Sequence, residues 1–356
     1  MSQTVLLDSK FKQQEVKSHR WITENEQKEW ISCLKSWNLR GLKGVSDGGL
    51  EWCASVVEKR HCQANHEHSI HTKYLLCGNR AICPRCAMSY ANKKSQAQYM
   101  YLKENFAKNL PFDSKLNQIV LTLPKDLHST KKNIFSKMVK DFMNKMGIDA
   151  YGYVIQDRHS KDPLSKKYAH AHCITLNVKE QEGYLIQNDY YFDLEQMRDI
   201  WKNVIKKNLD YQVNGFVNLH SEYASIINEP QKVKHILKYV YRYPIEDLFN
   251  VQVRNHSINY LEKGHFKNIQ REVFNLLSDK KSKFVWCGLL SSGKRKYLTG
   301  LLEMPQRFWQ NLVYYEKEIE RRSKLCRDCG MQLEDKPFET CDYQGDNEPE
   351  IFKPPS

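Results

Sequence analysis

The stretch YAHAHCITL, residues 168–176, decides how the fold is read. Its composition and alternation predict a β-strand, in which successive side chains point to opposite faces. Tyr168, His170 and His172 then share one face, and Ala171 points to the other. Two imidazoles about 6–7 Å apart along one strand face can bind one metal ion. The alternative is a pair of half-buried histidines on a sheet face, so the rest of the chain has to decide.

The segments on both sides of this strand predict a unit of mixed secondary structure. Periodicity and turn residues indicate strands at 116–124, 150–158, 168–178 and 214–223, and helices at 126–147, 193–209 and 229–244. The order strand, helix, strand, strand, helix, strand, helix favours an α+β fold, with an antiparallel sheet and flanking helices.

The charge of the chain indicates the class of partner. The 356 residues carry a formal net charge of +13, and this favours nucleic acid over an anionic membrane surface. The sequence has no run of about 18 apolar residues, so we expect no transmembrane helix and no membrane partner. The N-terminus lacks the apolar core of a signal peptide, and a cytoplasmic location is therefore the expectation.

A first cysteine group has the spacing of a zinc site. The segment CGNRAICPRC, residues 77–86, contains Cys77, Cys83 and Cys86, and its C-x2-C turn suits two thiolates of a tetrahedral ion. We favour Cys62 as the fourth ligand. The remaining candidates are His61, His66, His68, His71 and Cys53. Four protein ligands leave no open position, so this Zn²⁺ would be structural.

A second cysteine group lies near the C-terminus. Cys326 and Cys329 form another C-x2-C pair, and Cys341 follows twelve residues later. The pattern predicts a second zinc site of the ribbon type, with Cys287 or a histidine from elsewhere as the fourth ligand.

The segment KHILKYVYRYP, residues 234–244, predicts a helix that carries two tyrosines on one face. Tyr239 and Tyr243 are four residues apart, and His235 extends the same stripe toward the N-terminus. Taken alone, such a stripe is more often core packing than a catalytic site.

Taken in order, these elements resemble the HUH endonucleases. The strand IVLTLP, the histidine-apolar-histidine strand and the Tyr-x-x-x-Tyr helix are similar to those of rolling-circle replication initiators of plasmids and small viruses, and of related transposases. The resemblance covers about residues 115–245. The segment CGNRAICPRCAMSYANKKS looks like the cysteine motif that precedes the catalytic domain of plasmid initiators. The segments VWCGLLSSGKRKYL and CRDCGMQL are more similar to two-tyrosine transposases of rolling-circle insertion sequences.

The resemblance divides the chain into five parts. These are an N-terminal helical segment at 1–50, a cysteine-rich zinc-binding module and helix at 51–110, an HUH catalytic domain at 115–260, a C-terminal region with a zinc-ribbon-like element at 261–345, and a disordered tail at 346–356.

The resemblance also implies an activity. The chain would nick and rejoin single-stranded DNA at an origin, with Tyr239 as the nucleophile and Tyr243 as a second candidate. A 5′-phosphotyrosine link and a free 3′-hydroxyl would result. Lys238 and Arg242 would contact phosphate or phenolate, although many initiators carry lysine where Arg242 stands.

A divalent ion completes the expected site. Mn²⁺ or Mg²⁺ would be bound by His170, His172 and an oxygen from the preceding strand, for which Gln156 is favoured over Asp157. The ion would polarise the scissile phosphate.

The segment GLLSSGKR, residues 288–295, nearly matches a phosphate-binding loop. Arg295 occupies the place of the hydroxyl residue that binds Mg²⁺, and we expect a hairpin that turns at Ser292 and Gly293. No built-in helicase is therefore expected, and a host helicase and a host polymerase become the expected partners.

Three other interpretations remain open at this point. One is a two-tyrosine HUH transposase with the same chemistry. Another is a non-catalytic, zinc-dependent nucleic-acid-binding regulator. The last is a metal hydrolase in which water replaces tyrosine as the nucleophile.

Overall fold

The computed structural model describes most of the chain between residues 22 and 335. The described residues are 22–37, 50, 53–54, 57–64, 71–158, 161–164, 168–188, 193–215, 217–256, 271, 273, 275–276, 284–294, 298, 301–302 and 310–335. The predicted tail at 346–356 and most of the predicted segment at 1–50 lie outside them.

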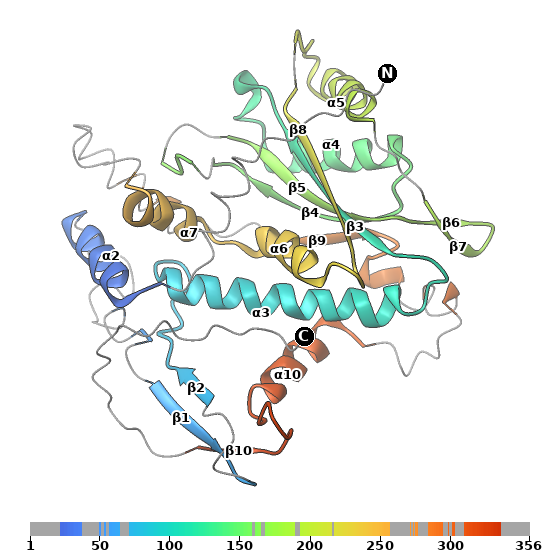
Figure 1. Ribbon diagram of the computed structural model, residues 1–356. Coiled ribbons are helices and arrows are strands. Elements are labelled where there is room, and N and C mark those ends of the chain that lie inside the picture. The colour runs from blue at the N-terminus through green and yellow to red at the C-terminus, as the bar shows by residue number, and fades with distance from the viewer. Residues whose placement is uncertain are drawn as a thin grey trace, which may run out of the picture.

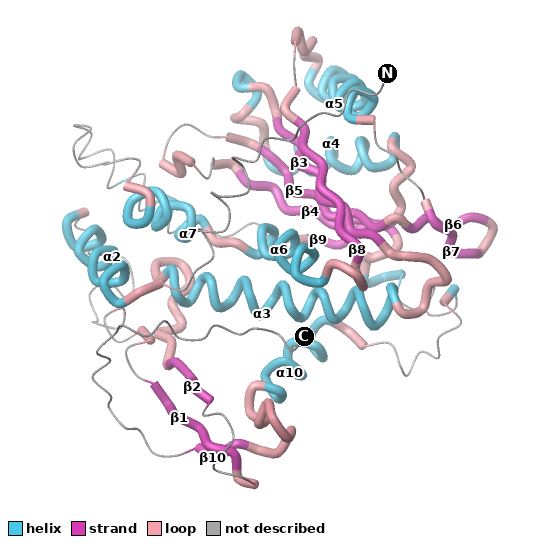
Figure 2. The backbone as a smooth tube through the Cα atoms, in the orientation of Figure 1, coloured by secondary structure: helices cyan, strands magenta, loops and turns pink. Residues whose placement is uncertain are grey.

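A five-stranded antiparallel sheet forms the centre of the molecule (Figure 1). The strand order is β8-β3-β5-β4-β9, and the bounds are Leu219–Ser225, Lys115–Thr122, His170–Leu176, Ala150–Gln156 and Val285–Gly288. The histidine strand β5 is therefore central. This arrangement, with helices against the sheet, confirms the predicted α+β fold (Figure 2).

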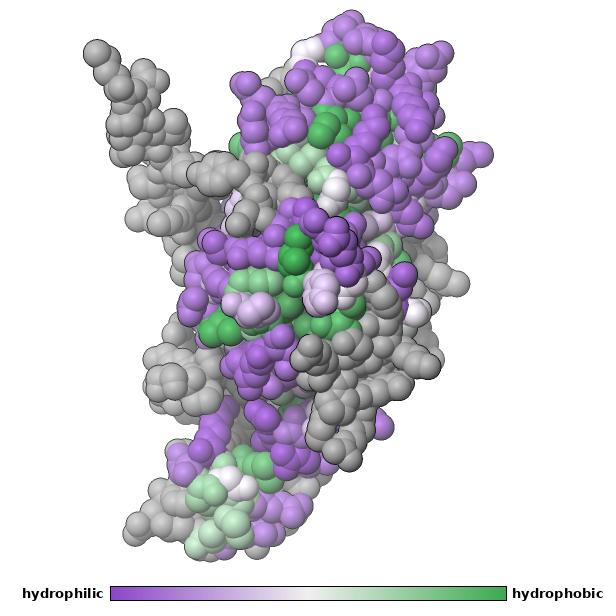
Figure 3. All heavy atoms as spheres, turned by 90° about the vertical axis from the view of Figure 1, so that its right-hand side faces the viewer, coloured by the Kyte–Doolittle hydropathy of each residue, from purple (hydrophilic) through white to green (hydrophobic). Residues whose placement is uncertain are grey.

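One face of the sheet packs on α4 (Lys132–Lys145) and α5 (Leu194–Leu209). Ala171 and Cys173 of β5 belong to this core, together with Phe135 of α4 and Trp201 of α5. The indole Nε1 of Trp201 donates a hydrogen bond of 2.9 Å to the carbonyl of Thr122, which fixes α5 to the sheet. Strands β6 (Val178–Gln181) and β7 (Tyr184–Gln187) form a hairpin. The outer surface formed by α5 and this hairpin is mostly hydrophilic (Figure 3), as expected for an outer layer.

The opposite face of the sheet packs on α6 (Pro230–Tyr241), which lies between the sheet and the long helix α3 (Pro84–Leu102) (Figure 1). Ile174 of β5 packs in a core with Val233 and Val240 of α6. Side chains two residues apart on a strand point the same way, so His170 and His172 share the face of Ile174. The histidine pair therefore faces α6.

The N-terminal helix packs away from the sheet. Helix α2 (Glu24–Ser36) begins with the predicted capping box of Thr23 and Glu26. Its Trp30 lies in a core with Phe249, which ends α7 (Pro244–Phe249), and with Cys83 and Cys86. A separate three-stranded sheet has the order β10-β1-β2, with bounds Leu333–Asp335, Val57–Cys62 and His71–Tyr74.

The predicted helix at 229–244 is two helices. Helix α6 ends at Tyr241, because Arg242 and Tyr243 are extended, with ψ of 141° and 147°. Pro244 explains the break, since a proline disfavours helical backbone at the preceding residue. The prediction that Tyr239 and Tyr243 share one helix face was therefore wrong.

The predicted hairpin around Ser292 and Gly293 was also wrong. Strand β9 pairs with β4 at the edge of the central sheet, and Ser292–Lys294 is a short 3₁₀ helix. Leu298 and Leu301 are helical rather than extended. The strand thus comes from the predicted C-terminal region but joins the sheet of the predicted catalytic domain.

The described part of the chain contains no helix that is both long and apolar enough to cross a membrane.

Candidate active site

The two histidines of β5 lie side by side with their ring centroids 4.9 Å apart. The Nδ1 of His170 bonds to the carbonyl oxygen of Tyr168 at 2.9 Å. Since a carbonyl only accepts, this Nδ1 carries the proton, and Nε2 carries the lone pair that a metal needs. The Nδ1 of His172 lies 3.0 Å from the side-chain amide of Gln118 on β3. The nearer Gln118 atom is the amide nitrogen, which donates, so Nδ1 of His172 accepts and the neutral ring carries its proton on Nε2.

The environment of His172 keeps its imidazole neutral. Burial lowers the pKa of His172 well below its ordinary value, and His170, Arg242 and His220 add to the effect through their charge. Metal ligation requires the neutral form. His172 meets this one requirement at neutral pH.

This lowered pKa predicts how stability depends on pH in the absence of metal. As the pH falls below about 6.5, the unfolded chain binds a proton at residue 172 that the folded chain excludes, so the free energy of unfolding falls by up to about 1.4 kcal/mol per pH unit. Urea unfolding in the presence of a chelator measures this between pH 7.5 and 5.5. The free energy of unfolding should fall more steeply for the wild type than for His172→Gln. Equal slopes would contradict a neutral His172 in the folded chain.

Gln156 and His220 share the face of the histidine pair. Gln156 is the backbone partner of His170 on the adjacent strand, so the two side chains start about 5 Å apart. His220 of β8 pairs with Val120, which in turn pairs with His172, and it therefore points to the same face from two strands away. The sequence analysis did not identify His220 as a site residue. The alternation of NLHSEY, in a predicted strand, could have placed its side chain on one face of the sheet.

Tyr239 of α6 lies over the histidine pair. Its ring stacks on that of His172, with centroids 6.1 Å apart and an interplanar angle of 19°. His235, one turn earlier, contacts the Tyr239 ring edge-on at 5.1 Å. The sheet and α6 thus bring a half-buried phenol next to two imidazoles that are 67 or more residues away in sequence. Geometry of this kind suits metal-assisted attack by a tyrosine on a phosphate.

Comparison with known proteins agrees with this geometry. Residues 83–208 match the family model described as Relaxase: MobA/VirD2-like, nuclease domain. This part of the chain is therefore similar to a relaxase-type nuclease domain. The match spans β3, β4 and the histidine strand, and it ends before Tyr239. No curated protein and no solved structure matches the chain significantly.

Arg242 lies beside the ring of Tyr239. The guanidinium carbon lies 5.9 Å from the centroid of the Tyr239 ring, and Nη2 forms a 2.7 Å ion pair with Asp247 of α7. Burial disfavours the charged form of Arg242, but Asp247, Glu246 and Tyr239 outweigh it and raise the pKa of Arg242. Burial also raises the pKa of Asp247 to about 6, against the opposing effect of Arg242. The cation next to Tyr239 is therefore held in place by α7.

Lys238 is buried near Glu246 of α7. Its side chain is buried, and burial lowers its pKa, while Glu246 partly opposes this shift. The structure thus places Lys238 with the carboxylate of α7. Its predicted contact with DNA phosphate remains a prediction.

Tyr243 caps the start of α7. Its ring meets that of Tyr90 on α3 edge-on, with centroids 5.6 Å apart, and its backbone N–H donates to the carboxylate of Glu246 at 3.1 Å. The structure therefore places Tyr243 beside α3, whereas Tyr239 stacks on His172.

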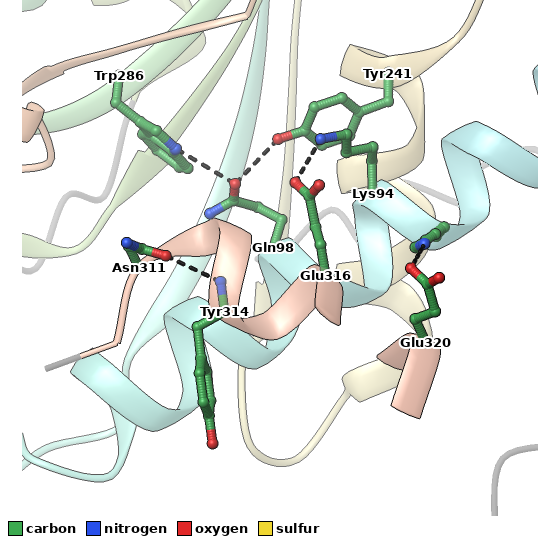
Figure 4. A network of polar contacts seen from close by, with 9 residues as sticks. Lys94, Gln98, Tyr241, Trp286, Asn311, Tyr314, Glu316 and Glu320 are labelled. Atoms are coloured by element: carbon green, nitrogen blue, oxygen red, sulfur yellow. Dashed lines mark hydrogen bonds and ion pairs between the residues drawn. The ribbon is translucent and has the colours of Figure 1, made fainter. Parts of the chain in front are cut away.

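A hydrogen-bond network fixes the end of α6 to the edge of the central sheet and to α3 (Figure 4). The carbonyl oxygen of the Gln98 side chain, on α3, accepts from the hydroxyl of Tyr241 at 3.0 Å and from Nε1 of Trp286 at 3.4 Å. Tyr241 is the last residue of α6, and Trp286 belongs to β9. One buried amide thus joins the tyrosine helix, the sheet edge and α3.

Removal of the Tyr241 hydroxyl should weaken this network and leave the phenol of Tyr239 unchanged. Tyr241→Phe leaves the buried Gln98 oxygen with one donor instead of two, so we expect it to lower the free energy of unfolding by about 1 kcal/mol. Chemical denaturation of the wild type and the variant measures this. An unchanged midpoint would mean that the hydrogen bond adds nothing to stability.

A cluster of four thiols lies where α3 begins. The cluster consists of Cys53, Cys77, Cys83 and Cys86. The sulfur–sulfur distances are 3.4 Å for Cys53–Cys83, 3.6 Å for Cys53–Cys86 and 3.5 Å for Cys77–Cys86. A tetrahedral ion with Zn–S bonds of about 2.3 Å holds its thiolates about 3.8 Å apart, so the cluster fits zinc. The prediction of Cys62 as the fourth ligand was wrong, because Cys53 occupies that place.

Cys62 lies with the other cysteine group. It forms a cluster with Cys326 and Cys329, and the three ligand atoms lie within 4.8 Å of one another. Cys341, which sequence analysis assigned to this group, lies outside the described residues. The predicted alternative Cys287 is instead part of β9, where it is the backbone partner of Tyr151.

Proposed function

We propose that this protein nicks and rejoins single-stranded DNA at an origin, with Tyr239 as the nucleophile. The stacking of Tyr239 on His172 is the observation that carries the proposal, since it places a phenol next to two adjacent imidazoles. The relaxase-type nuclease domain supports a DNA-nicking function, and the formal charge of +13 suits a polyanionic substrate.

The proposed reaction is an in-line displacement at phosphorus. The phenolic oxygen of Tyr239 attacks the scissile phosphate, an O–P bond forms, and the bond from phosphorus to the 3′-oxygen breaks. The phenolic proton passes to solvent, and the leaving 3′-oxygen takes up a proton to become a free hydroxyl. The 5′-phosphate stays on Tyr239, so the same site can rejoin strands by the reverse attack.

Two features of the chain favour this reaction. The guanidinium of Arg242 lies near the Tyr239 ring and stabilises negative charge on the phenol oxygen. His170, His172 and Gln156 would hold a divalent cation, Mn²⁺ or Mg²⁺, since they combine neutral imidazole with amide oxygen on one sheet face. When bound, the cation supplies Lewis-acid polarisation of the phosphate.

The proposed setting is the origin of a rolling-circle replicon. There the free 3′-hydroxyl primes a host polymerase, while a host helicase unwinds the duplex. A second candidate is a relaxase that nicks a plasmid for strand transfer, and the MobA/VirD2-like description of the matched domain favours it.

A cleavage assay tests the shared chemistry. Single-stranded DNA from the region around the gene is incubated with the protein and Mn²⁺ and analysed on a denaturing gel. A protein band shifted by attached DNA is expected. Cleavage without an adduct would make water the nucleophile and overturn the proposal.

The third metal ligand has its own test. Loss of a residue that only orients a metal ligand already costs about 10–100-fold in affinity, so we expect loss of the ligand itself in Gln156→Ala to lower Mn²⁺ affinity by at least about 10-fold. His220→Ala, from the same face but two strands away, should change it less than about threefold. Isothermal titration with Mn²⁺ measures both, and the reverse pattern would make His220 the ligand.

A further inference from the structure

A second group of thiols joins two distant parts of the chain. Cys62 ends β1, and Cys326 and Cys329 lie in the turn between α10 (Leu312–Arg322) and β10. The sulfur atoms of Cys62 and Cys329 are 3.4 Å apart although 267 residues separate them. This distance matches the spacings of 3.4–3.6 Å within the first cluster.

The spacing fits a metal better than a disulfide. Two thiolates on one tetrahedral zinc lie about 3.8 Å apart, whereas bonded sulfurs lie about 2.05 Å apart. The turn itself has the form of a metal knuckle. The N–H of Gly330 donates to the carbonyl of Cys326 at 2.9 Å, and the N–H of Cys326 donates to Met331 at 2.7 Å. Gly330 has φ of 74°, which allows the tight return of the chain.

The small sheet around these thiols has almost no apolar core. Strand β1 pairs with β10 through Cys62 and Leu333, and the only buried apolar cluster in the described part of this sheet consists of Cys62, Cys326 and Leu333. So little buried apolar surface does not order three short strands, and small units of this kind usually need a metal or a disulfide.

We propose that Cys62, Cys326 and Cys329 bind a second Zn²⁺ that fastens the N-terminal hairpin to the C-terminal C-x2-C turn. No further His, Cys, Asp or Glu among the described residues has a ligand atom within the same 4.8 Å group. The site is thus defined by three thiolates, one of them from the opposite end of the chain.

This zinc would also hold α10 in place. Helix α10 directly precedes the C-x2-C turn and packs along α3, where Lys94 pairs with Glu316 and Lys93 pairs with Glu320 at 3.0 Å (Figure 4). Those ion pairs are partly exposed and contribute little alone. The buried ring of Tyr315 on α10 also meets Tyr101 of α3, with centroids 6.4 Å apart, so the metal-bound turn would be a second anchor for α10.

Zinc content of the purified full-length chain tests the proposal. After gel filtration in metal-free buffer, elemental analysis should find two zinc ions per wild-type chain, and one in Cys62→Ser and in Cys329→Ser. Cys329 is exposed, so its replacement keeps the test valid if Cys62→Ser fails to fold. Cys287→Ser is the matched control and should keep two. One zinc in the wild type, or two in Cys329→Ser, would overturn the proposal.

Limited proteolysis supplies an independent readout. With the second zinc lost, trypsin should cut after Arg321 and Arg322 of α10 at least several-fold faster than in the wild type, because the C-terminal end of the helix loses its anchor. Unchanged cleavage in Cys329→Ser would contradict the anchoring role. Neither experiment depends on DNA cleavage, so failure here is distinguishable from failure of the proposed function.

Discussion

Tyr239→Phe is expected to abolish the covalent DNA–protein adduct and to reduce nicking by about 10⁴-fold or more. The substitution removes the attacking oxygen and keeps the ring that stacks on His172. Tyr168 contacts the ring of His170 at 5.3 Å, but Tyr239 is the described tyrosine whose ring stacks on His172. An adduct that persists in Tyr239→Phe but is lost in Tyr168→Phe would assign the nucleophile to Tyr168. Quantitative single-turnover cleavage with Mn²⁺, followed on a denaturing gel, measures the loss.

Two neighbouring tyrosines provide matched controls. Tyr241→Phe should retain the adduct, since the Tyr241 hydroxyl bonds to Gln98 and not to the histidine pair. Tyr243→Phe should retain the first nick, since the ring of Tyr243 packs against Tyr90. An adduct that persists in Tyr239→Phe but disappears in Tyr243→Phe would assign the nucleophile to Tyr243.

Cys53→Ser is expected to have the largest effect on folding. Cys53 replaces the predicted Cys62 in the four-thiol cluster, and this cluster sits in one core with Trp30 of α2 and Phe249 of α7. Loss of one ligand weakens zinc binding, and the free energy of zinc binding stabilises the fold. We therefore expect the free energy of unfolding to fall by roughly 3 kcal/mol or more. Thermal or urea unfolding, together with zinc analysis, measures this.

Cys33→Ser is the control for this variant. Cys33 lies on α2 beside the same core but outside both thiol clusters, so the variant should keep its zinc and most of its stability. Full zinc content in Cys53→Ser would restore Cys62 as the candidate fourth ligand.

Local patterns in the sequence identified most of the central elements. The alternation of YAHAHCITL predicted a strand with both histidines on one face, and β5 has this arrangement. Thr23 and Glu26 marked the start of α2, since a capping box is formed by residues three apart. Such features depend on neighbours in sequence, so one stretch of residues contains the whole signal.

Long-range pairing could not be read in the same way. The C-x2-C spacing predicted a thiolate site. Whether Cys53 or Cys62 completes this site depends on how residues 57–62 pair with a strand near residue 333. The helix break at Arg242 moved Tyr243 from the face of Tyr239 to α3, and the strand at 285–288 completed a sheet begun at 115.

Residue types, spacing and periodicity alone determined the α+β class, the histidine face and the presence of thiolate sites. The tertiary structure decided which thiols meet, which tyrosine lies on the histidines and that His220 shares their face. The physical reason is that alternation and capping act between residues a few positions apart, whereas these contacts require the chain to close loops of tens to hundreds of residues. Their geometry is set by the packing of sheet and helices, which no short segment encodes.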